Sequence, residues 1–468
     1  MRSMIAVAAV LVAAANLPGQ SAPSSLNAPE TFPVHTFPAS APASRPATAS
    51  VPATMPWAAD AAHRPTETIC RQALDWFDRA EGLVDAMMPA AEVTAAKMAA
   101  GGRLYFAGNR GFADEFDFRA GGFTFNLVYD LDKPVADGDA ILIGQFRPNE
   151  PEWRLSRVLS RVQFRGNFDK GQVVYFTSLA WPQTRRMLAG VDRAFWASRL
   201  EVFDTGAPAG AGMAPQSLGQ LGAAALAWAY CGEVIAAATR QGKTLATWGS
   251  DAEPGGHDWD ESVRGHNLHP KYKVPPIPAG RLGREYLRQC RLQVEQFART
   301  QPPQVRLAAS RMARTVRAGG TLWVVTNAHV HPSGGAIPPE LPVLNFGREF
   351  MFRQYLRNMP AGDMLVYLAY LGYPRQDADT ALARSCQAVT ASVQPGPTND
   401  RLTHIQTSWK PYDTVLELPE YPIRVLPTSG VVTTPLWYAL WAETLEALAE
   451  NKTEPGKNPD PGGSGGTR

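Results

Sequence analysis

The most constraining feature of the sequence is a set of three segments, each of which occurs twice and in the same order. AAGGRLYFAGN, which starts at Ala99, is echoed by RAGGTLWVVTN, which starts at Arg317. The other two pairs are DGDAILIGQFRPNEPEW (from Asp137) with AGDMLVYLAYLGYPRQD (from Ala361), and LAWAYCGEVIAAA (from Leu226) with LWYALWAETLEAL (from Leu436). An internal duplication, in which the order of elements is kept and the loops differ in length, is the simplest account.

The length and the charge of the chain limit what it can be. Its 468 residues are enough for two hydrophobic cores of ordinary domain size. The 45 basic residues nearly balance the 43 acidic ones, whereas binding to a phosphate backbone needs a concentrated basic surface. We therefore expect no nucleic acid among the partners of this protein.

The N-terminus has the pattern of an export signal. A positively charged MRS precedes the apolar run MIAVAAVLVAAANL, which is too short to span a bilayer comfortably. We expect residues 1–22 to be a signal peptide, so that the exported protein lies in the periplasm or cell envelope and has no membrane segment after cleavage. The alternatives are a misassigned start of a cytoplasmic protein and an uncleaved N-terminal anchor.

The segment after the signal is poor in the residues that build a core. Residues 23–65 are mostly Pro, Ala, Ser and Thr and carry almost no charge, a composition that buries too little apolar surface to offset the entropy of ordering. We expect a disordered linker there, with residues 1–64 adding nothing to the fold, and a disordered tail at residues 451–468.

Each copy of the repeat alternates strand-like and helix-like segments. In residues 66–240 (the first half) the predicted strands are LYFAG, FTFNLVYDL, AILIG, QVVYFTS and SRLEVFDT. In residues 284–450 (the second half) they are TLWVVTN, LPVLN, DMLVYLAYLG and DTVLELP, with ADTALARSCQAV as a helix. Apolar strands that alternate with helices predict parallel sheets covered on both faces. The predicted fold class is α/β, with two doubly wound parallel-sheet domains joined by a connector at residues 241–283.

Four cysteines lie far apart in the sequence and form no C-x-x-C pair. Their spacing excludes zinc ribbons and thioredoxin-type redox centres. Two disulfides in an exported protein and four buried free thiols both remain open.

Several segments of the first half resemble the sugar isomerase (SIS) domain. GGRLYFAGNRG is similar to the opening strand and glycine loop of that family, GDAILIGQFRPNEPEWRLSRVL to its central strand, loop and helix, and VVYFTS to the strand that follows. With the repeat, the resemblance covers about residues 66–240 and 284–450. It implies binding of sugars or sugar phosphates, and it implies an internal pseudo-dimer, because SIS domains generally pair with one another.

The sequence departs from the family where the phosphate would bind. SIS domains have a hydroxyl-rich loop of S-x-S-G-x-T character, which is missing at residues 145–150 and 370–375. Pro148 has no N–H to donate there, and Glu150 would repel a phosphate. Arg147 and Arg375 could supply positive charge instead, since a guanidinium pairs with two phosphate oxygens at once.

These observations lead to three hypotheses about function. The first is a protein that binds a carbohydrate derivative, which could be a phosphosugar, at a degenerate SIS site and is not an active isomerase. The second is an aldose–ketose isomerase or a related phosphosugar enzyme. The third is a structural or scaffolding protein of the cell envelope that binds no ligand.

Ligands of open parallel sheets bind beyond the carboxyl ends of the strands. The candidate ligand-binding residues are therefore Asn109, Arg110, Gln145, Arg147 and Ser178 in the first half, and Asn327, His329, Tyr370 and Arg375 in the second. No residue is assigned a catalytic role. Glu233 and Glu443 occupy matching places in the last helix of each half, where a surface position explains both.

The sequence predicts neither a cofactor nor a metal site. No G-x-G-x-x-G opens a helix, which argues against a dinucleotide, and no G-x-S-x-G marks a nucleophile. The connector is rich in histidine and carboxylate between His257 and His269, but the spacing matches no metal-binding motif.

Overall fold

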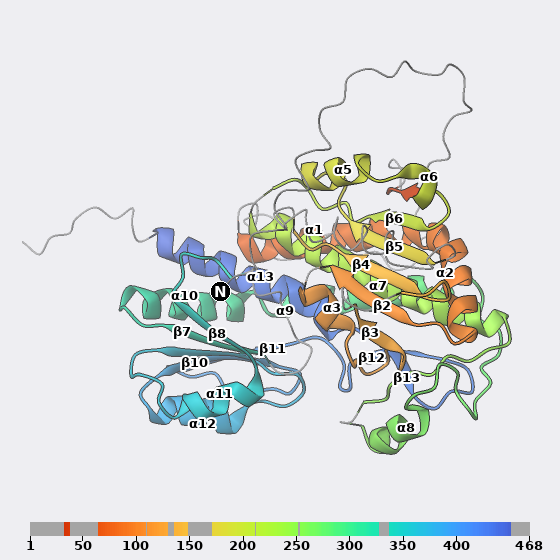
Figure 1. Cartoon of the computed structure of the whole chain (residues 1–468). Coiled ribbons are helices and arrows are strands. Elements are labelled where there is room, and N and C mark those ends of the chain that lie inside the picture. Colours follow the sequence, from red (N-terminus) through yellow and green to blue (C-terminus); the bar gives the residue numbers. More distant parts are fainter. Residues whose placement is uncertain are drawn as a thin grey trace, which may run out of the picture.

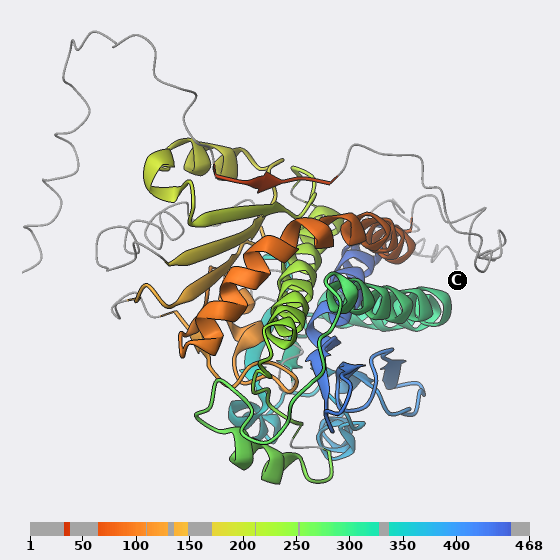
Figure 2. The same cartoon turned by 90° about the vertical axis from the view of Figure 1, so that its right-hand side faces the viewer.

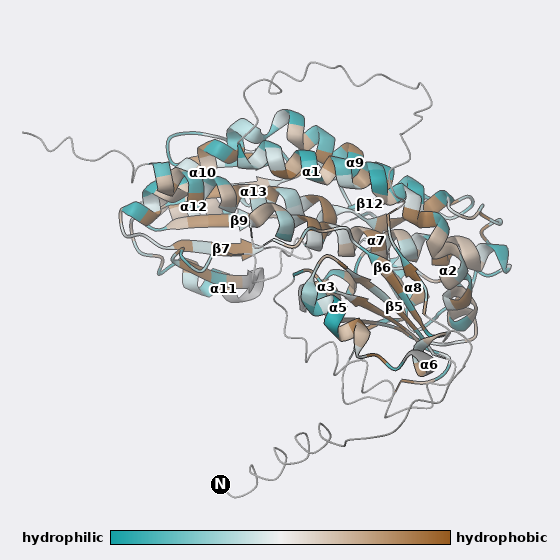
Figure 3. Ribbon diagram, turned by 90° about the horizontal axis from the view of Figure 1, so that it is seen from above, coloured by the Kyte–Doolittle hydropathy of each residue, from teal (hydrophilic) through white to brown (hydrophobic). Residues whose placement is uncertain are grey.

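The computed structural model describes residues 32–37, 64–108, 110–129, 135–147, 171–210, 212–250, 253–326 and 337–450. Two parallel β-sheets lie beside each other, and long helices run between and over them (Figure 1). In Figure 3 the strands of both sheets are predominantly hydrophobic, whereas the outer helices carry hydrophilic faces.

The first sheet has six parallel strands in the order β1-β6-β5-β4-β2-β3. Their bounds are β1 Val34–His35, β2 Leu104–Gly108, β3 Asn126–Val128, β4 Ala140–Gly144, β5 Gln172–Thr177 and β6 Leu200–Asp204. The chain reverses its direction of progress between β2 and β4, because β3 pairs on one side of β2 and β4 on the other. Ligand crevices of open parallel sheets form at such a point.

The second sheet has five parallel strands in the order β11-β10-β9-β7-β8. Their bounds are β7 Leu322–Thr326, β8 Val343–Arg348, β9 Met364–Leu368, β10 Gln387–Ser392 and β11 Leu402–Gln406. LYFAG and LWVVT therefore occupy the same position in their sheets, as do AILIG and MLVYL. The predicted α/β class with two parallel sheets is confirmed, and the shared strand order is the one that a duplication predicts.

One strand assignment and one helix assignment in the second half were wrong. DTVLELP is not in the parallel sheet, because β12 (Thr414–Glu417) pairs antiparallel with β13 (Arg424–Pro427). The predicted helix that ran through QAV ends earlier, since α12 covers only Arg375–Ala383 and Ser385 turns the chain with φ 61°. The residues after Ser385 form β10, and β11 completes the sheet.

Each half has two long helices at its start and one at its end. The first half has α1 (Pro65–Ala80), the short η2 (Glu81–Leu83), α2 (Val84–Ala99) and α7 (Met213–Arg240); the second has α9 (Arg281–Thr300), α10 (Pro302–Arg317) and α13 (Ser429–Glu450). The shorter helices are α3 (Arg110–Phe116), α5 (Pro182–Ala189), α6 (Arg193–Trp196), α8 (Gly256–Val263) and α11 (Glu349–Leu356). Gly101 and Gly319, with φ of 91° and 83°, end α2 and α10 as left-handed C-caps.

Helix α7 lies at the centre of the molecule and packs against α2, α9, α13 and α1 (Figure 2). It is long and apolar enough to cross a membrane, but the apolar window is completely buried inside the protein, as in the core helix of a globular fold. One hydrophobic cluster extends from Phe106 of the first sheet to Val324 of the second. The four cysteines are buried free thiols, and burial raises the pKa of Cys70, Cys231 and Cys290.

Glu233 and Glu443 are not on the surface, contrary to the expectation from the sequence. Glu233 of α7 is fully buried and accepts the backbone N–H groups of Gly280 (2.6 Å) and Gly283 (2.8 Å) at the start of α9. Glu443 of α13 accepts the backbone N–H (3.0 Å) and the hydroxyl (2.6 Å) of Thr66 at the start of α1. The closing helix of each half therefore caps the opening helix of the other.

The expectation that residues 1–64 add nothing to the fold was also wrong. Residues 32–37 lie along the edge of the first sheet, where β1 pairs with β6. Average composition missed them because the few large apolar residues of the linker, such as Phe32 and Phe37, are outnumbered by Pro, Ala, Ser and Thr. The expected signal peptide, the remainder of the linker and the C-terminal tail lie outside the described residues.

The reciprocal caps should contribute strongly to stability. Replacing Glu443 with Ala leaves the Thr66 N–H and hydroxyl buried without their acceptor, so we expect the free energy of unfolding in urea to fall by about 1.5–3 kcal/mol, the range for hydrogen bonds to a charged group. Glu233→Ala should cost a similar amount. Glu446→Ala, on the same helix as Glu443, is the matched control; an equal loss in the control would show that the caps are unimportant.

Candidate functional site

The structure describes only some of the nine candidate residues that the sequence predicts. Asn109, Asn327 and His329 lie outside the described residues, and of Arg110 the structure describes only the backbone, at the start of α3. The other five are Gln145, Arg147, Ser178, Tyr370 and Arg375, and they do not form one site.

Gln145, directly after β4, is committed to the structure of the protein. Its side-chain oxygen accepts hydrogen bonds from the hydroxyls of Tyr175 (2.5 Å), Thr177 (2.7 Å) and Thr184 (3.0 Å). Its amide nitrogen donates to the backbone oxygen of Arg147 at 3.1 Å. Since the side chain is buried and its oxygen already has three donors, it has little capacity left for a ligand.

Ser178 and the crevice beside β4 are closed in the same way. The Ser178 hydroxyl is buried and donates to the backbone oxygen of Ala207 at 2.5 Å. A Cβ on Gly144, the last residue of β4, would lie 2.0 Å from the ring of Phe112. The Phe112 ring therefore fills the place where a ligand would approach this strand end, and Phe146 packs against that ring with centroids 5.7 Å apart.

Among the first-half candidates whose side chains the structure describes, Arg147 keeps partial access to solvent. It is half-buried, and its positive charge lies close enough to Tyr438 of α13 to oppose the rise in pKa that burial causes in that phenol. The Tyr438 hydroxyl donates to the side-chain oxygen of Gln220 on α7 at 3.2 Å. Arg147, Tyr438 and Gln220 thus gather polar groups where β4, α7 and α13 meet.

Arg375 lies on the surface of the second half. It is exposed at the first position of α12 and borders a depression of about 590 Å³ with Gln376, Asp379 and Thr380. This depression is formed by one face of a single helix, so it offers little enclosure to a ligand.

Tyr370, which follows β9, takes part in a buried polar cluster at the carboxyl end of the second sheet. Its hydroxyl interacts with Asp413 and Ser250, and burial and then Asp413 raise its pKa. The indole N–H of Trp409 donates to the Tyr370 backbone oxygen at 3.0 Å.

Asp413 occupies the N-terminus of α13. One carboxylate oxygen accepts the backbone N–H groups of Thr428 (2.8 Å) and Ser429 (2.5 Å), and the other accepts the Ser429 hydroxyl at 2.7 Å. Free N–H groups and the positive end of the helix dipole make such a terminus a favourable place for an anion. In this protein the anion is the side chain of Asp413.

Arg119 of the first half pairs with this carboxylate. Its Nη2 lies 3.0 Å from an oxygen of Asp413 and 3.3 Å from an oxygen of Glu115, and it donates to the Ser429 hydroxyl at 2.9 Å. Arg119 is 1% exposed, and its Nε and Nη1 have no hydrogen-bond partner in the described parts of the chain. We call Glu115, Arg119, Asp413 and Ser429 the clasp.

Local geometry aims Arg119 across the boundary between the halves. Phe118, with φ 47°, and Gly121, with φ 73°, turn the chain sharply after α3. A Cβ on Gly121 would lie 2.6 Å from Thr414 and 2.7 Å from the backbone nitrogen of Leu426, so glycine is needed for this segment to approach the β12–β13 hairpin.

The electrostatics of the clasp are unusual because it contains two buried carboxylates and one guanidinium. Burial raises the pKa of Glu115 to about 7, although Arg119 and the indole N–H of Trp228, 3.0 Å away, act in the opposite direction. Burial also disfavours the charge of Arg119, but Glu115 and Asp413 outweigh it and raise the pKa of that guanidinium.

No sequence motif predicts the clasp. Arg119 and Asp413 lie in irregular segments of different halves, and neither belongs to a repeated motif. Among the described residues, no three His, Cys, Asp or Glu side chains lie together as a metal site would require. The polar groups brought together here are suited to pairing charges rather than to holding an ion.

Comparison with known proteins finds likeness in architecture. No protein-family model and no curated protein sequence match the chain. Among solved structures, it is similar to the C-terminal domain of glucosamine-fructose-6-phosphate aminotransferase from Francisella tularensis, with 9% identity and a TM-score of 0.49 over 83% of this chain and 98% of that one. It is also similar to a "putative sugar binding protein" from Salmonella typhimurium LT2, with 11% identity and a TM-score of 0.47 over 81% and 98%. Identities this low establish no function, so the ligand must be inferred from the residues of this chain.

Glu115 should give the stability a pH dependence with a definite sign. Because its pKa in the folded state is about 7, above the ordinary 4.5, the folded state binds more protons than the unfolded state between these values. The free energy of unfolding should therefore fall as the pH rises from about 4.5 to 7, by about 3 kcal/mol from this residue.

The variant Glu115→Gln isolates this effect, since it keeps an acceptor for the Trp228 N–H but does not ionise. We expect urea titrations at pH 5 and pH 8 to show the parent losing about 3 kcal/mol relative to the variant over this interval. A difference between parent and variant that stays constant with pH would show that Glu115 titrates as an ordinary carboxyl.

Proposed function

We propose that this protein is a divergent SIS-type protein, with an internal pseudo-dimer of two duplicated halves, that binds a carbohydrate derivative without isomerising it. The observation that carries the proposal is the position of Asp413. Its carboxylate occupies the N-terminus of α13 and is paired with Arg119, so this helix terminus of the second half, which would favour an anionic ligand, already holds an anion. The ligand would then belong to the first half.

The clasp also argues against an isomerase. Aldose–ketose isomerisation needs a base that reaches a carbon-bound proton of the substrate. Glu115 has a pKa suited to that task, but it is only 3% exposed. Its Oε2 is packed so closely against Gly430 that a Cβ added to this glycine would lie 1.9 Å from it. A sugar carbon has no room to approach this carboxylate.

In the first half, the ligand would contact Arg147. Arg147 is half-buried, and an arginine side chain can donate two parallel hydrogen bonds to a carboxylate or phosphate. The Tyr438 hydroxyl and the Gln220 amide beside it are buried and bonded to each other at 3.2 Å, so Arg147 is the contact on which this site depends. We therefore propose an anionic sugar derivative; export, if the N-terminal pattern is a signal, would favour a cell-wall sugar over an intracellular metabolite.

A thermal-shift screen of the whole chain tests the proposal. Sugar phosphates, amino-sugar phosphates, acidic sugars and neutral cell-wall sugars should be compared at matched concentrations, because a ligand that binds only the folded state raises the melting temperature. We expect an anionic sugar to stabilise the protein and no ketose to form from an aldose. Turnover would instead support the isomerase, and the absence of any stabilising sugar would support the structural alternative that the filled crevice beside Gly144 already favours.

Affinity for the stabilising sugar should depend on Arg147. Arg147→Ala removes a hydrogen bond to a charged group, so we expect a loss of about 1.5–3 kcal/mol in binding free energy by titration calorimetry. Arg375→Ala, which removes an exposed arginine from the second half, should leave the affinity unchanged. Equal effects of the two substitutions would contradict a site in the first half.

A further inference from the structure

The outer edge of β6 is covered by a short segment that arrives from the N-terminal linker. Val34 and His35 pair in parallel with Val202 and Phe203, and the Val202 N–H donates to the backbone oxygen of Pro33 at 3.1 Å. Figure 2 shows this short strand lying along the edge of the first sheet. Proline is tolerated there because an edge strand leaves some N–H positions unused.

Two phenylalanines anchor the segment on opposite faces of the sheet. Phe32 is buried in the cluster that contains Trp196 and Val202 on one face. Phe37 packs on the cluster of the other face, with its ring edge-on to Trp76 at 6.4 Å between centroids. A Cβ on Gly206 would lie 2.2 Å from the Phe37 ring, so the absence of a side chain at Gly206 makes the seat for this ring.

Polar and cationic contacts add specificity between the anchors. The His35 ring stacks on Phe203 at 4.8 Å, and its Nε2 lies 2.8 Å from a carboxylate oxygen of Glu201. The Arg79 guanidinium carbon lies 4.9 Å above the centre of the Phe37 ring. Val34 is different, because its side chain is 43% exposed. The edge therefore contacts the side chains of Phe, His and Phe at positions 1, 4 and 6 of an extended peptide.

We propose that the outer edge of β6 is a peptide-binding groove and that residues 32–37 are its ligand, bound in cis and able to detach. An edge strand that is extended by a peptide obtains affinity from main-chain hydrogen bonds and specificity from side-chain pockets, and both are present here. The opposing term is the conformational entropy of ordering six residues, which favours the detached state.

The test uses the full chain and a labelled peptide with the sequence of residues 31–38, TFPVHTFP. In the double variant Phe32→Ala/Phe37→Ala the cis segment should no longer occupy the groove. We expect fluorescence anisotropy to show saturable binding of the peptide to this variant, at least about tenfold tighter than to the parent, whose groove is occupied. A peptide with Val34 replaced by Ala should bind as well as the original, and one with both phenylalanines replaced should not bind.

Hydrogen exchange supplies a second measurement that does not depend on the variant. In the parent, the Val202 amide should exchange through local opening that is insensitive to low denaturant, unlike the amides of β5. In the double variant it should exchange faster and be slowed again by the peptide. The proposal is overturned if the peptide binds the parent and the double variant equally, if it binds neither, or if Val202 exchanges in the parent only on global unfolding.

Discussion

Two buried glutamates hold the halves together at points where backbone donors would otherwise lose their partners. A helix begins with N–H groups that have no acceptor within the helix, and the beginnings of α1 and α9 are packed inside the molecule. Glu443 of α13 supplies the acceptor for Thr66 in α1, and Glu233 of α7 supplies it for Gly280 and Gly283 in α9. Each half is therefore completed by the other, and the positions of α7 and α13 are fixed relative to both sheets.

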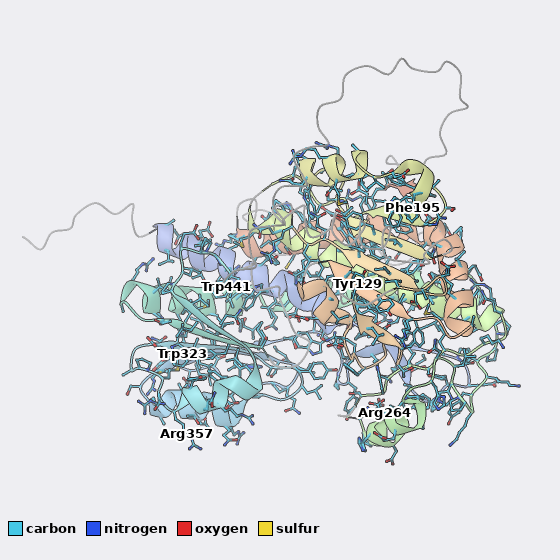
Figure 4. All side chains as sticks on the ribbon, viewed as in Figure 1. Tyr129, Phe195, Arg264, Trp323, Arg357 and Trp441 are labelled. Atoms are coloured by element: carbon cyan, nitrogen blue, oxygen red, sulfur yellow. The ribbon has the colours of Figure 1, made fainter. Side chains whose placement is uncertain are left out.

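Helix α7, which is held in place by these caps, also packs closely against the segment after β4 and against the β12–β13 hairpin. A Cβ on Gly219 would lie 2.4 Å from the backbone oxygen of Phe146, and one on Gly232 would lie 3.0 Å from Leu426. The small residues of α7 thus allow the end of β4 and the β12–β13 hairpin to approach it closely. On α13, the Tyr438 phenol lies close enough to Arg147 to feel its charge. Trp441 of the same helix, labelled in Figure 4, is buried near the boundary between the halves.

The sequence predicted local features well because they depend on nearby residues. The apolar runs at β2, β4, β7 and β9 and the glycines that end α2 and α10 identified the repeated units. Prediction from the sequence failed where a contact joins residues that are far apart along the chain. Asp413 has no visible partner in the sequence until folding brings Arg119 to it. Glu233 and Glu443 were assigned to the surface because they are charged, although both lie in largely apolar helices. The prediction for the linker failed for another reason: its composition was judged as an average, and two phenylalanines among many small residues hardly change that average.

Three positions that would accept a partner in a fold of this kind are filled by the chain itself. The Phe112 ring covers the end of β4, Asp413 occupies the N-terminus of α13, and residues 32–37 cover the edge of β6. A ligand can enter such a position only by displacing the resident group, and the cost differs among the three. Displacing Asp413 would leave the buried Arg119 without this carboxylate, and breaking a buried ion pair costs about 3–5 kcal/mol. Displacing residues 32–37 exposes two aromatic rings and separates His35 from Glu201, but it breaks no fully buried ion pair and restores the conformational freedom of six residues. Among the described residues, small-molecule recognition is therefore best sought at Arg147, and exchange of a bound segment at β6.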